Sequence, residues 1–450
     1  MTTAKAPGVY VTERPSGVRT ITGVSTSVPA FVGYTKKLNA IGEQTLLPFT
    51  DEERRAPQRM DSWKEFTERY NITAVADELA KQKKALSQAG AEEDKKKARR
   101  GIRIAERCMV LAEAVYGFFA NGGSTCYVVG FTDPAKKVVA AGVGGLEGSA
   151  DRPLKGLAGL QTVPEVSMVA VPGLWDMTTD VSEEETLPPP VDADGKTLIG
   201  KAVAHCVTMR NRVGIFEPPP GKKPTDVETF LKDQPAQGSD AAFTTYYYPW
   251  IRVPGVDGVD RTVPPSGHVA GVWARTDTER GVFKAPANQN LRGVLDMPVL
   301  LTDLAQGRLN EMGVNCLRVF PGQGLLVWGA RTRSKDRDWV YLNVRRLVCF
   351  LAESIRLSST WAVFEPNDDR LWASLRHSVT SFLTDQWRQG ALLGRTPEEA
   401  FFVVCDRTNN ISSTIDLGKV ICDIGVAPVR PAEFVHFQIT QIAGQPAKTG

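Results

Sequence analysis

The sequence contains no stretch that would serve as a membrane span or as a secretion signal. Its 450 residues include no apolar run of the length that a transmembrane helix needs, about 18 residues. The first residues, Met1 to Gly8, lack the apolar core of a signal peptide. We therefore expect a chain that is neither inserted into a membrane nor secreted through a cleaved leader.

Paired cysteines and a large net charge are missing as well. The seven cysteines form no CxxC spacing, and most lie in apolar runs such as Leu347–Leu351, where we expect them to be buried as small hydrophobic residues. Their odd number, without a secretion signal, fits a reducing cytoplasm. The net charge of +3 is too small to make nucleic acid the main partner.

Motifs for metal, nucleotide and nucleophilic chemistry are absent. The four histidines lie far apart and show no HExxH spacing. Gly195-Lys-Thr197 resembles the end of a phosphate-binding loop, but Pro190 occupies the place of the first glycine. Ser266 is not part of a Gly-x-Ser-x-Gly motif. We therefore expect no catalytic residue, no metal and no cofactor.

One charged segment keeps an enzymatic interpretation open. His268, Asp277 and Glu279 lie close together in the sequence and would serve as acid and base groups in an enzyme. Ion pairing accounts for the same charge density. In a second charged segment, Pro366–Arg370, a helix N-cap at Asn367 or Asp368 accounts for the polar residues. A cytoplasmic α/β enzyme is therefore the alternative function.

The first half of the chain alternates strand and helix patterns. Short apolar runs typical of buried strands occur at residues 30–33, 126–131, 166–172 and 212–216, with helical patterns between them. This alternation predicts a parallel α/β layer. We assign residues 25–260 to an outer α/β domain.

A charged helical insert interrupts this domain at residues 73–101. Helix-forming residues dominate the insert, and Gly90 divides it into two halves, which predicts a solvated helical hairpin. The basic run 94–100 would alternatively bind a polyanion, but acidic residues are interleaved with it. A separate amphipathic helix at 109–119 is expected to end at Asn121-Gly-Gly123.

The second half predicts a mixed α/β domain over residues 261–430. Its expected elements are helices at 267–280, 343–360 and 370–389, and strands at 317–320, 325–328 and 400–405. The helix at 370–389 is amphipathic. Its apolar stripe consists of Leu371, Leu375, Val379, Phe382 and Leu383, and its opposite face carries Arg370, His377, Thr384 and Arg388.

Both ends of the chain read as extended arms that carry one strand each. Prolines flank a short alternating segment in the N-terminal arm, residues 1–24, and two prolines stiffen the approach to the C-terminal arm, residues 431–450. The expected strand residues are Val9, Tyr10, Val11 and Thr12 in the first arm and Phe434, Val435, His436, Phe437, Gln438 and Ile439 in the second. Such strands need a sheet edge to pair with, either in the same molecule or in a neighbour.

An ordered succession of short motifs resembles the contractile tail sheath family, which includes phage tail sheaths, R-type pyocin sheaths and the sheaths of extracellular contractile injection systems. The motifs are dense after residue 245 and sparser before it. They are Pro7–Val11, Gly23–Gly33, Gly117–Gly123, Val171–Gly173, Tyr248–Trp250, Pro264–Gly271, Ala274–Val282, Lys284–Asn288, Leu309–Asn310, Val327–Thr332, Asn343–Arg346, Phe364–Asn367 and Val426–Phe434.

The resemblance implies a structural protein. Subunits of this family stack as six-fold rings around an inner tube, and neighbours' N- and C-terminal arms complete the sheet of each C-terminal domain. It implies partners in the tube, the baseplate and a cap protein, no direct contact with nucleic acid, and assembly in a bacterial cytoplasm before release on lysis. The tube-facing residues would be Arg370, His377 and Arg388. A third alternative is a monomeric adhesin or scaffold whose arms fold back onto its own sheet.

Overall fold

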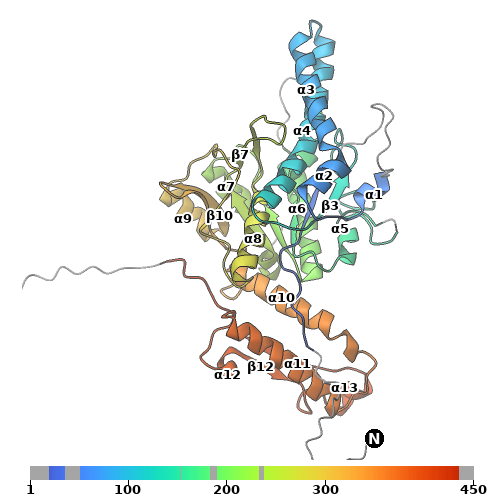
Figure 1. Cartoon of the computed structure of the whole chain (residues 1–450), viewed down its shortest axis with the longest axis vertical. Helices are drawn as coiled ribbons and strands as arrows, with labels where there is room; N and C mark the ends of the chain where they lie inside the picture. Colours follow the sequence, from blue (N-terminus) through green and yellow to red (C-terminus); the bar gives the residue numbers. More distant parts are fainter. Residues whose placement is uncertain (1–19, 36–50, 153, 183–189, 233–237, 435–450) are drawn as a thin grey trace, which may run out of the picture.

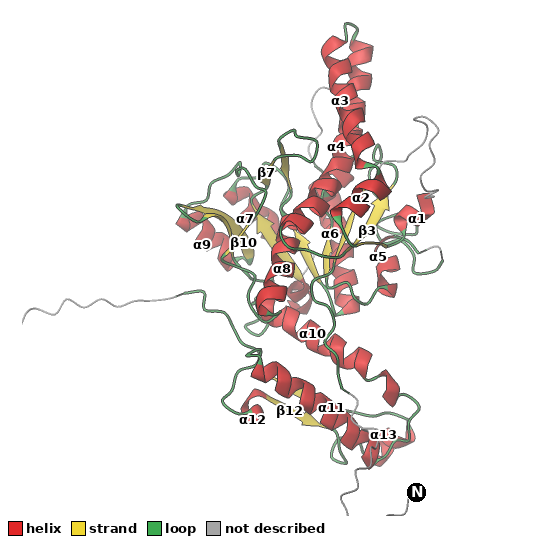
Figure 2. Cartoon of the chain, viewed as in Figure 1, coloured by secondary structure: helices red, strands yellow, loops and turns green. Residues whose placement is uncertain are grey.

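The computed structural model describes residues 20–35, 51–152, 154–182, 190–232 and 238–434. A large α/β body is joined to a smaller C-terminal unit through one long helix, α10 (Leu342–Ser358), as Figures 1 and 2 show. The predicted mixed α/β class is confirmed. In the described part of the chain, no helix combines the length and the apolar character that a bilayer crossing requires.

A nine-stranded mixed sheet forms the centre of the large body. Its strand order is β2-β3-β1-β4-β5-β6-β10-β11-β9, and the five adjacent strands from β3 to β6 run parallel. The strands are β1 (Pro29–Tyr34), β2 (Gln58–Met60), β3 (Cys126–Phe131), β4 (Met168–Ala170), β5 (Val213–Phe216), β6 (Thr244–Tyr248), β9 (Gln289–Asn290), β10 (Val314–Phe320) and β11 (Gly324–Trp328). The predicted parallel layer is therefore present, and β2 closes one edge in antiparallel fashion.

This sheet continues across residues 260 and 261, where the sequence analysis divides the chain. β10 pairs in parallel with β6, so that Val314 lies opposite Tyr246, and the antiparallel strands β11 and β9 extend the sheet further. Val314 and Tyr246 are completely buried. The change in sequence pattern near 260 thus falls inside one hydrophobic core instead of between two, and the large body extends to the start of α10.

Two helices cross on one face of the sheet at very close range. Both α4 (Glu92–Ala120) and α8 (Ser266–Arg280) pack there, and glycines on α8 make the approach possible. A Cβ atom on Gly267 would lie 2.3 Å from the carbonyl oxygen of Ala114, and one on Gly271 would lie 2.5 Å from that of Phe118. A larger residue at either position would push the two helices apart.

The predicted helical hairpin is confirmed, with one correction. α3 (Ile72–Gln88) and α4 pack along each other and project from the body (Figure 1). However, the insert and the helix predicted at 109–119 are one continuous helix of 29 residues, which ends at Asn121 as expected. The separate assignment was wrong because a polar, solvated half and an apolar, core-facing half of one helix differ strongly in composition.

The remaining elements of the large body connect or cover the sheet. They are α1 (Asp51–Arg55), α2 (Trp63–Tyr70), α5 (Gly156–Gly159), α6 (Asp192–Met209), α7 (Pro224–Lys232), α9 (Asp303–Glu311), the hairpin strands β7 (Ile251–Val253) and β8 (Arg261–Val263), and the 3₁₀ helices η1 (Leu160–Thr162), η2 (Leu174–Thr178) and η3 (Gly238–Phe243).

The C-terminal unit is built around α11 (Asp369–Arg388). Each of the five residues in its predicted apolar stripe is buried, and Val379, Phe382 and Leu383 pack with Leu347 and Leu351 of α10. Asp368 is the N-cap of α11, as one of the two candidates predicted, because its side chain accepts from the backbone N–H groups of Arg370 and Leu371. The other elements are η4 (Thr360–Ala362), α12 (Pro397–Ala400), β12 (Phe401–Val404), α13 (Ser412–Asp416) and β13 (Asp423–Val426).

Candidate assembly site

α10 holds the start of the described chain along one of its faces. The backbone N–H of Thr22 donates to Ser358 Oγ at 3.2 Å, and that of Val24 donates to Ser354 Oγ at 3.1 Å. The geometry matches, because two residues of extended chain span roughly 6.6 Å and one helical turn of four residues spans roughly 6 Å. The two serines therefore act as a ladder for an extended segment, residues 20–28, which we call the N-terminal root.

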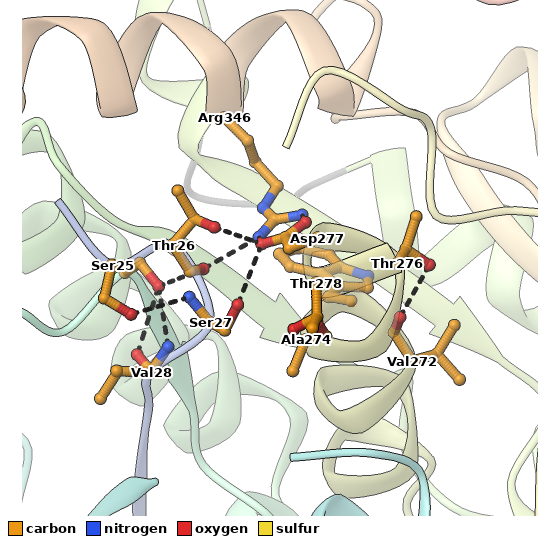
Figure 3. Close-up of polar contacts among 12 residues, drawn as sticks. Ser25, Thr26, Ser27, Val28, Val272, Ala274, Thr276, Asp277, Thr278 and Arg346 are labelled. Carbon is orange, nitrogen blue, oxygen red and sulfur yellow. Dashed lines mark hydrogen bonds and ion pairs between the residues drawn. The ribbon is translucent and has the colours of Figure 1, made fainter. Parts of the chain in front are cut away.

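A buried ion pair fixes the inner end of this root. Arg346 of α10 donates to both carboxylate oxygens of Asp277 on α8, at 2.9 and 2.5 Å, and each side chain is 3% exposed. The same guanidinium donates to the carbonyl oxygen of Thr26 at 3.0 Å, and the Thr26 hydroxyl donates to Asp277 at 2.6 Å. Figure 3 shows these groups converging from three segments that are distant in sequence.

The C-terminal end of the root leads directly into the large sheet. The Ser167 hydroxyl donates to the carbonyl oxygen of Thr26 at 2.6 Å, and the backbone N–H of Val28 donates to Ser167 Oγ at 3.3 Å. β1 then begins at Pro29. The N-terminal root thus connects a central strand of the body to the face of α10, passing between the body and the C-terminal unit.

The other end of the chain has a root of its own, residues 427–433. Asn343, at the start of α10, donates to the carbonyl oxygen of Val429 at 3.0 Å. The Glu433 carboxylate accepts from Nε and Nη2 of Arg331, and the two side chains are 16% and 15% exposed. The hydrogen bond from Arg331 to this carboxylate is the main reason that the pKa of Arg331 is raised. The C-terminal root therefore returns from the small unit to the large body.

Phe434, the residue that follows this root, is exposed to solvent. Phe434 is 69% exposed and has no regular secondary structure. It is the first of the six strand residues predicted in the C-terminal arm. The other five, Val435 to Ile439, lie outside the described residues, as do Val9, Tyr10, Val11 and Thr12 of the N-terminal arm.

The C-terminal unit offers a sheet that is small and open. β12 and β13 pair antiparallel from Phe401–Val426 to Val404–Asp423, and these two strands make up the whole sheet in the described chain. Phe402 is 58% exposed, and Leu393 and Ile424 nearby are exposed as well. A two-stranded sheet is marginal by itself, and its outer edges carry backbone groups that a further strand would pair.

The residues expected to face a tube occupy one exposed face of α11. Arg370, His377 and Arg388 are all exposed, and their spacing of 7 and 11 residues keeps them on one side of the helix. Arg388 makes only an exposed ion pair with Asp385 at 3.5 Å. The face is therefore basic and open to solvent.

The groups of the enzymatic alternative point in different directions. His268 is buried where α8 crosses α4, and burial lowers its pKa to about 4. Asp277 belongs to the ion pair with Arg346, and Glu279 is exposed. The structure therefore does not bring these three residues together, and it gives Asp277 a structural partner instead. The ion pairing expected for this charged segment is confirmed.

The sequence did not indicate which side chains hold the two roots in place. Arg331, Asn343, Arg346 and Glu433 lie within the motifs quoted for the family resemblance, but their partners are 60 to 320 residues away in the chain. Ser354 and Ser358 lie outside those motifs. Their spacing of four residues on one helix face was the only signal available, and such spacing is common.

Comparisons with known proteins agree with this architecture. Two family models match: the phage tail sheath protein central domain over residues 190–333 and the phage tail sheath C-terminal domain over residues 334–442. The tail sheath protein of Vibrio phage KVP40 is 31% identical over 180 residues, which are 39% of this chain and 26% of that protein. A putative prophage major tail sheath protein of Pseudomonas aeruginosa is 28% identical over 40% of this chain and 46% of its own length. The matched regions thus span less than half of these curated relatives.

Matches to solved structures extend over nearly the whole chain. A chain of the anti-feeding prophage baseplate is 28% identical with a TM-score of 0.68, covering 98% of this chain and 100% of its own. A chain of the PVC sheath complex, an extracellular contractile injection system in its contracted state, is 26% identical with a TM-score of 0.65, covering 98% of this chain and 99% of its own. Sequence and structure thus lead to one conclusion: this chain belongs to the phage tail sheath family.

Proposed function

We propose that this chain is the structural subunit of a contractile sheath. Identical subunits would form stacked six-fold rings around an inner tube, and contraction of the stack would drive that tube through a target envelope. The observation that carries the proposal is that the described chain begins and ends in extended segments that are held on or beside α10. The full-length similarity to chains of the anti-feeding prophage and PVC particles supports it.

The arms are the connections between subunits in this proposal. The strand residues Val9–Thr12 and Phe434–Ile439 of neighbours add to the edges of the β12–β13 sheet. Each added strand supplies about 4–6 backbone hydrogen bonds of about 1 kcal/mol each. Because donor and acceptor surfaces differ, the contact propagates from subunit to subunit instead of closing on itself.

Contraction then exchanges the weaker contacts while the arms keep neighbours connected. We assign the acceptor role to residues 342–430, which is narrower than the 261–430 expected from the sequence, because the large sheet already includes residues 289–328. The large body and this unit move as rigid bodies, and the chain beyond the two roots bends. A modest preference of each subunit for the contracted arrangement adds up over the stack, so no nucleotide is required.

The inner tube would contact the basic face of α11. Arg370, His377 and Arg388 point to an acidic partner surface, because opposite charges steer and orient an encounter. Reversing the charge with Arg370→Glu and Arg388→Glu should abolish association with the tube while sheath polymers still form. Arg395→Glu, on an exposed loop after α11, is the control and should leave tube association unchanged.

The place of the protein in a particle follows from the same proposal. The sheath would be assembled in a bacterial cytoplasm as part of a phage tail or tail-like particle, and lysis would release it. Its further partners would be a baseplate, on which the first ring sits, and a cap protein at the far end. A chain of the anti-feeding prophage baseplate is among the similar structures.

Negative-stain microscopy of the purified chain tests the proposal. The full chain should form striated tubes. Replacing Val435, Phe437 and Ile439, one face of the predicted strand, by serine should abolish tubes and leave a folded subunit. Replacing His436 and Gln438, the other face, by alanine is the matched control. Tubes that form equally well with both variants would contradict the role of the arms, and a full chain that remains as compact particles with the tube present would contradict the proposal itself.

A further inference from the structure

Two cysteines face each other at the end of the β12–β13 sheet. The antiparallel register pairs Val404 with Asp423, so the next position places Cys405 opposite Cys422. Residues directly opposite in such a ladder have Cα atoms about 4.5–5.5 Å apart. A disulfide accepts Cα separations of roughly 4.4–6.8 Å. The backbone therefore already has the spacing that a cross-strand disulfide needs.

The side chains point to the same place. Cys405 is completely buried in a small cluster with Leu371, Trp372 and Leu375 of α11, and Cys422 packs against this cluster. The thiols of Cys405 and Cys422 are hydrogen-bonded to each other. Cys422 is only half-buried, whereas the other six cysteines of the chain are buried. An oxidant in solution thus has access to this pair through Cys422.

The surroundings favour a thiolate on Cys405. The hydrogen bond from Cys422 is the largest cause of a lowered pKa at Cys405, and the positive charge of Arg376 and the side chain of Asn410 act in the same direction. Arg376 is held in place by a hydrogen bond to the carbonyl oxygen of Cys405 at 3.2 Å and by an ion pair with Asp406 at 3.6 Å. Burial and the charge of Asp406 oppose the effect.

We propose that Cys405 and Cys422 form a reversible disulfide when the protein meets a small-molecule disulfide oxidant. The Cys405 thiolate takes the proton of the Cys422 thiol, and the Cys422 thiolate attacks one sulfur of the oxidant. The first small thiol leaves with that proton from Cys405, and the Cys405 thiolate then attacks the Cys422 sulfur. The second small thiol leaves with a proton from water. Two electrons pass from the protein to the oxidant, which is reduced to two thiols.

The bond would tie β12 to β13 beside the loop that carries α13. It resists slippage of the two strands and limits the unfolded chain by closing a loop from residue 405 to residue 422. Its value for assembly rests on the proposed function, in which this sheet receives the neighbours' strands. The thiols would be free during assembly in a reducing cytoplasm, and the disulfide would form in a more oxidising medium after release.

The test uses the full-length chain at a concentration where it is unassembled, incubated with oxidised glutathione or with a reducing agent. Oxidation should lower the intact mass by about 2 Da without adding glutathione. Alkylation of the oxidised chain after it is unfolded should then label five of the seven cysteines, and peptide mapping should recover residues 405 and 422 in one cross-linked product. Full labelling of all seven, a stable glutathione adduct or a different cross-linked pair would overturn the proposal.

Variants make the assignment specific. Cys422→Ser, at the half-buried position, should abolish the loss of mass, whereas Cys349→Ala should retain it. Cys349 is the matched control because it is the neighbour of another buried cysteine, Cys206. Oxidation should also raise the unfolding temperature of the wild-type chain and leave that of Cys422→Ser unchanged. All of these readouts are independent of tube formation, so a failure of the sheath proposal would not be mistaken for a failure of this one.

Discussion

Asp277 and Arg346 form a fully buried, two-bond ion pair that joins the large body to α10 and also holds the backbone of Thr26. The pair therefore lies at the point where the body, the helix to the C-terminal unit and the N-terminal root meet. The Arg346 guanidinium also lies over the ring of Trp273, 4.7 Å from its centre, which fixes its plane.

Asp277→Asn should strongly destabilise the subunit. The substitution keeps the shape but leaves the Arg346 charge buried without its counter-charge, which costs about 3–5 kcal/mol of the free energy of unfolding. Denaturant unfolding measures this change. Asp385→Asn is the control, because the Asp385–Arg388 pair is exposed and its loss should change the free energy by no more than about 0.5 kcal/mol. Equal effects of the two variants would show that the buried pair is not the anchor described above.

Arg331→Gln should release the C-terminal root without unfolding the body. The substitution removes the charge-assisted hydrogen bonds to Glu433, which are worth about 1.5–3 kcal/mol. Since about 1.4 kcal/mol corresponds to a factor of ten, the concentration needed for tube formation should rise by about ten- to a hundredfold. Arg430→Gln, which breaks the exposed pair with Asp338, is the control and should leave that concentration nearly unchanged. Sedimentation of tubes over a range of subunit concentrations gives both values.

The serine ladder on α10 predicts which backbone amides become unprotected. Ser354→Ala should speed hydrogen exchange at the N–H of Val24, and Ser358→Ala should speed it at the N–H of Thr22. Each bond contributes about 1 kcal/mol, so exchange should accelerate by roughly fivefold. Ser381→Ala, on the exposed side of α11, should alter neither amide. Protection that persists at both amides would mean that the segment is held by other contacts.

Glu217→Gln should change how stability depends on pH. Glu217 is buried, and burial raises its pKa to about 8 from an ordinary 4.5. The folded state thus holds a proton that the unfolded state has already lost, so this residue lowers stability as the pH rises from about 4.5 to 8. The glutamine variant needs no proton. At pH 9 it should be more stable than the wild type by on the order of 5 kcal/mol, and at pH 4 the difference should largely vanish. A difference that does not depend on pH would contradict the raised pKa.

The local parts of the fold were predictable from the sequence because they depend on neighbouring residues. Apolar runs gave β1, β3, β4 and β5, and the apolar stripe of α11 gave its buried face. The continuation of the large sheet past residue 260 was not predictable in this way. It depends on β10 returning to pair with β6, some 70 residues earlier in the chain, and period-2 patterns carry no information about the identity of a partner strand.

The same limit applies to the candidate site. Alternation identified a strand in the C-terminal arm, and charge density indicated ion pairing around Asp277. Neither pattern indicated that Asp277 pairs with Arg346 or that Glu433 pairs with Arg331. The partners of these two pairs are 69 and 102 residues apart in the sequence. Long-range pairs of this kind are set by the packing of whole elements and become visible only in the folded chain.

A density map of assembled tubes at near-atomic resolution tests the central claim most directly. The account predicts that residues 434–439 of one subunit run as a strand along the β12–β13 sheet of a different subunit, with Glu433 still bound to Arg331 of its own body. A map in which both chain ends fold back onto the subunit that bears them, with no strand shared between neighbours, would contradict it.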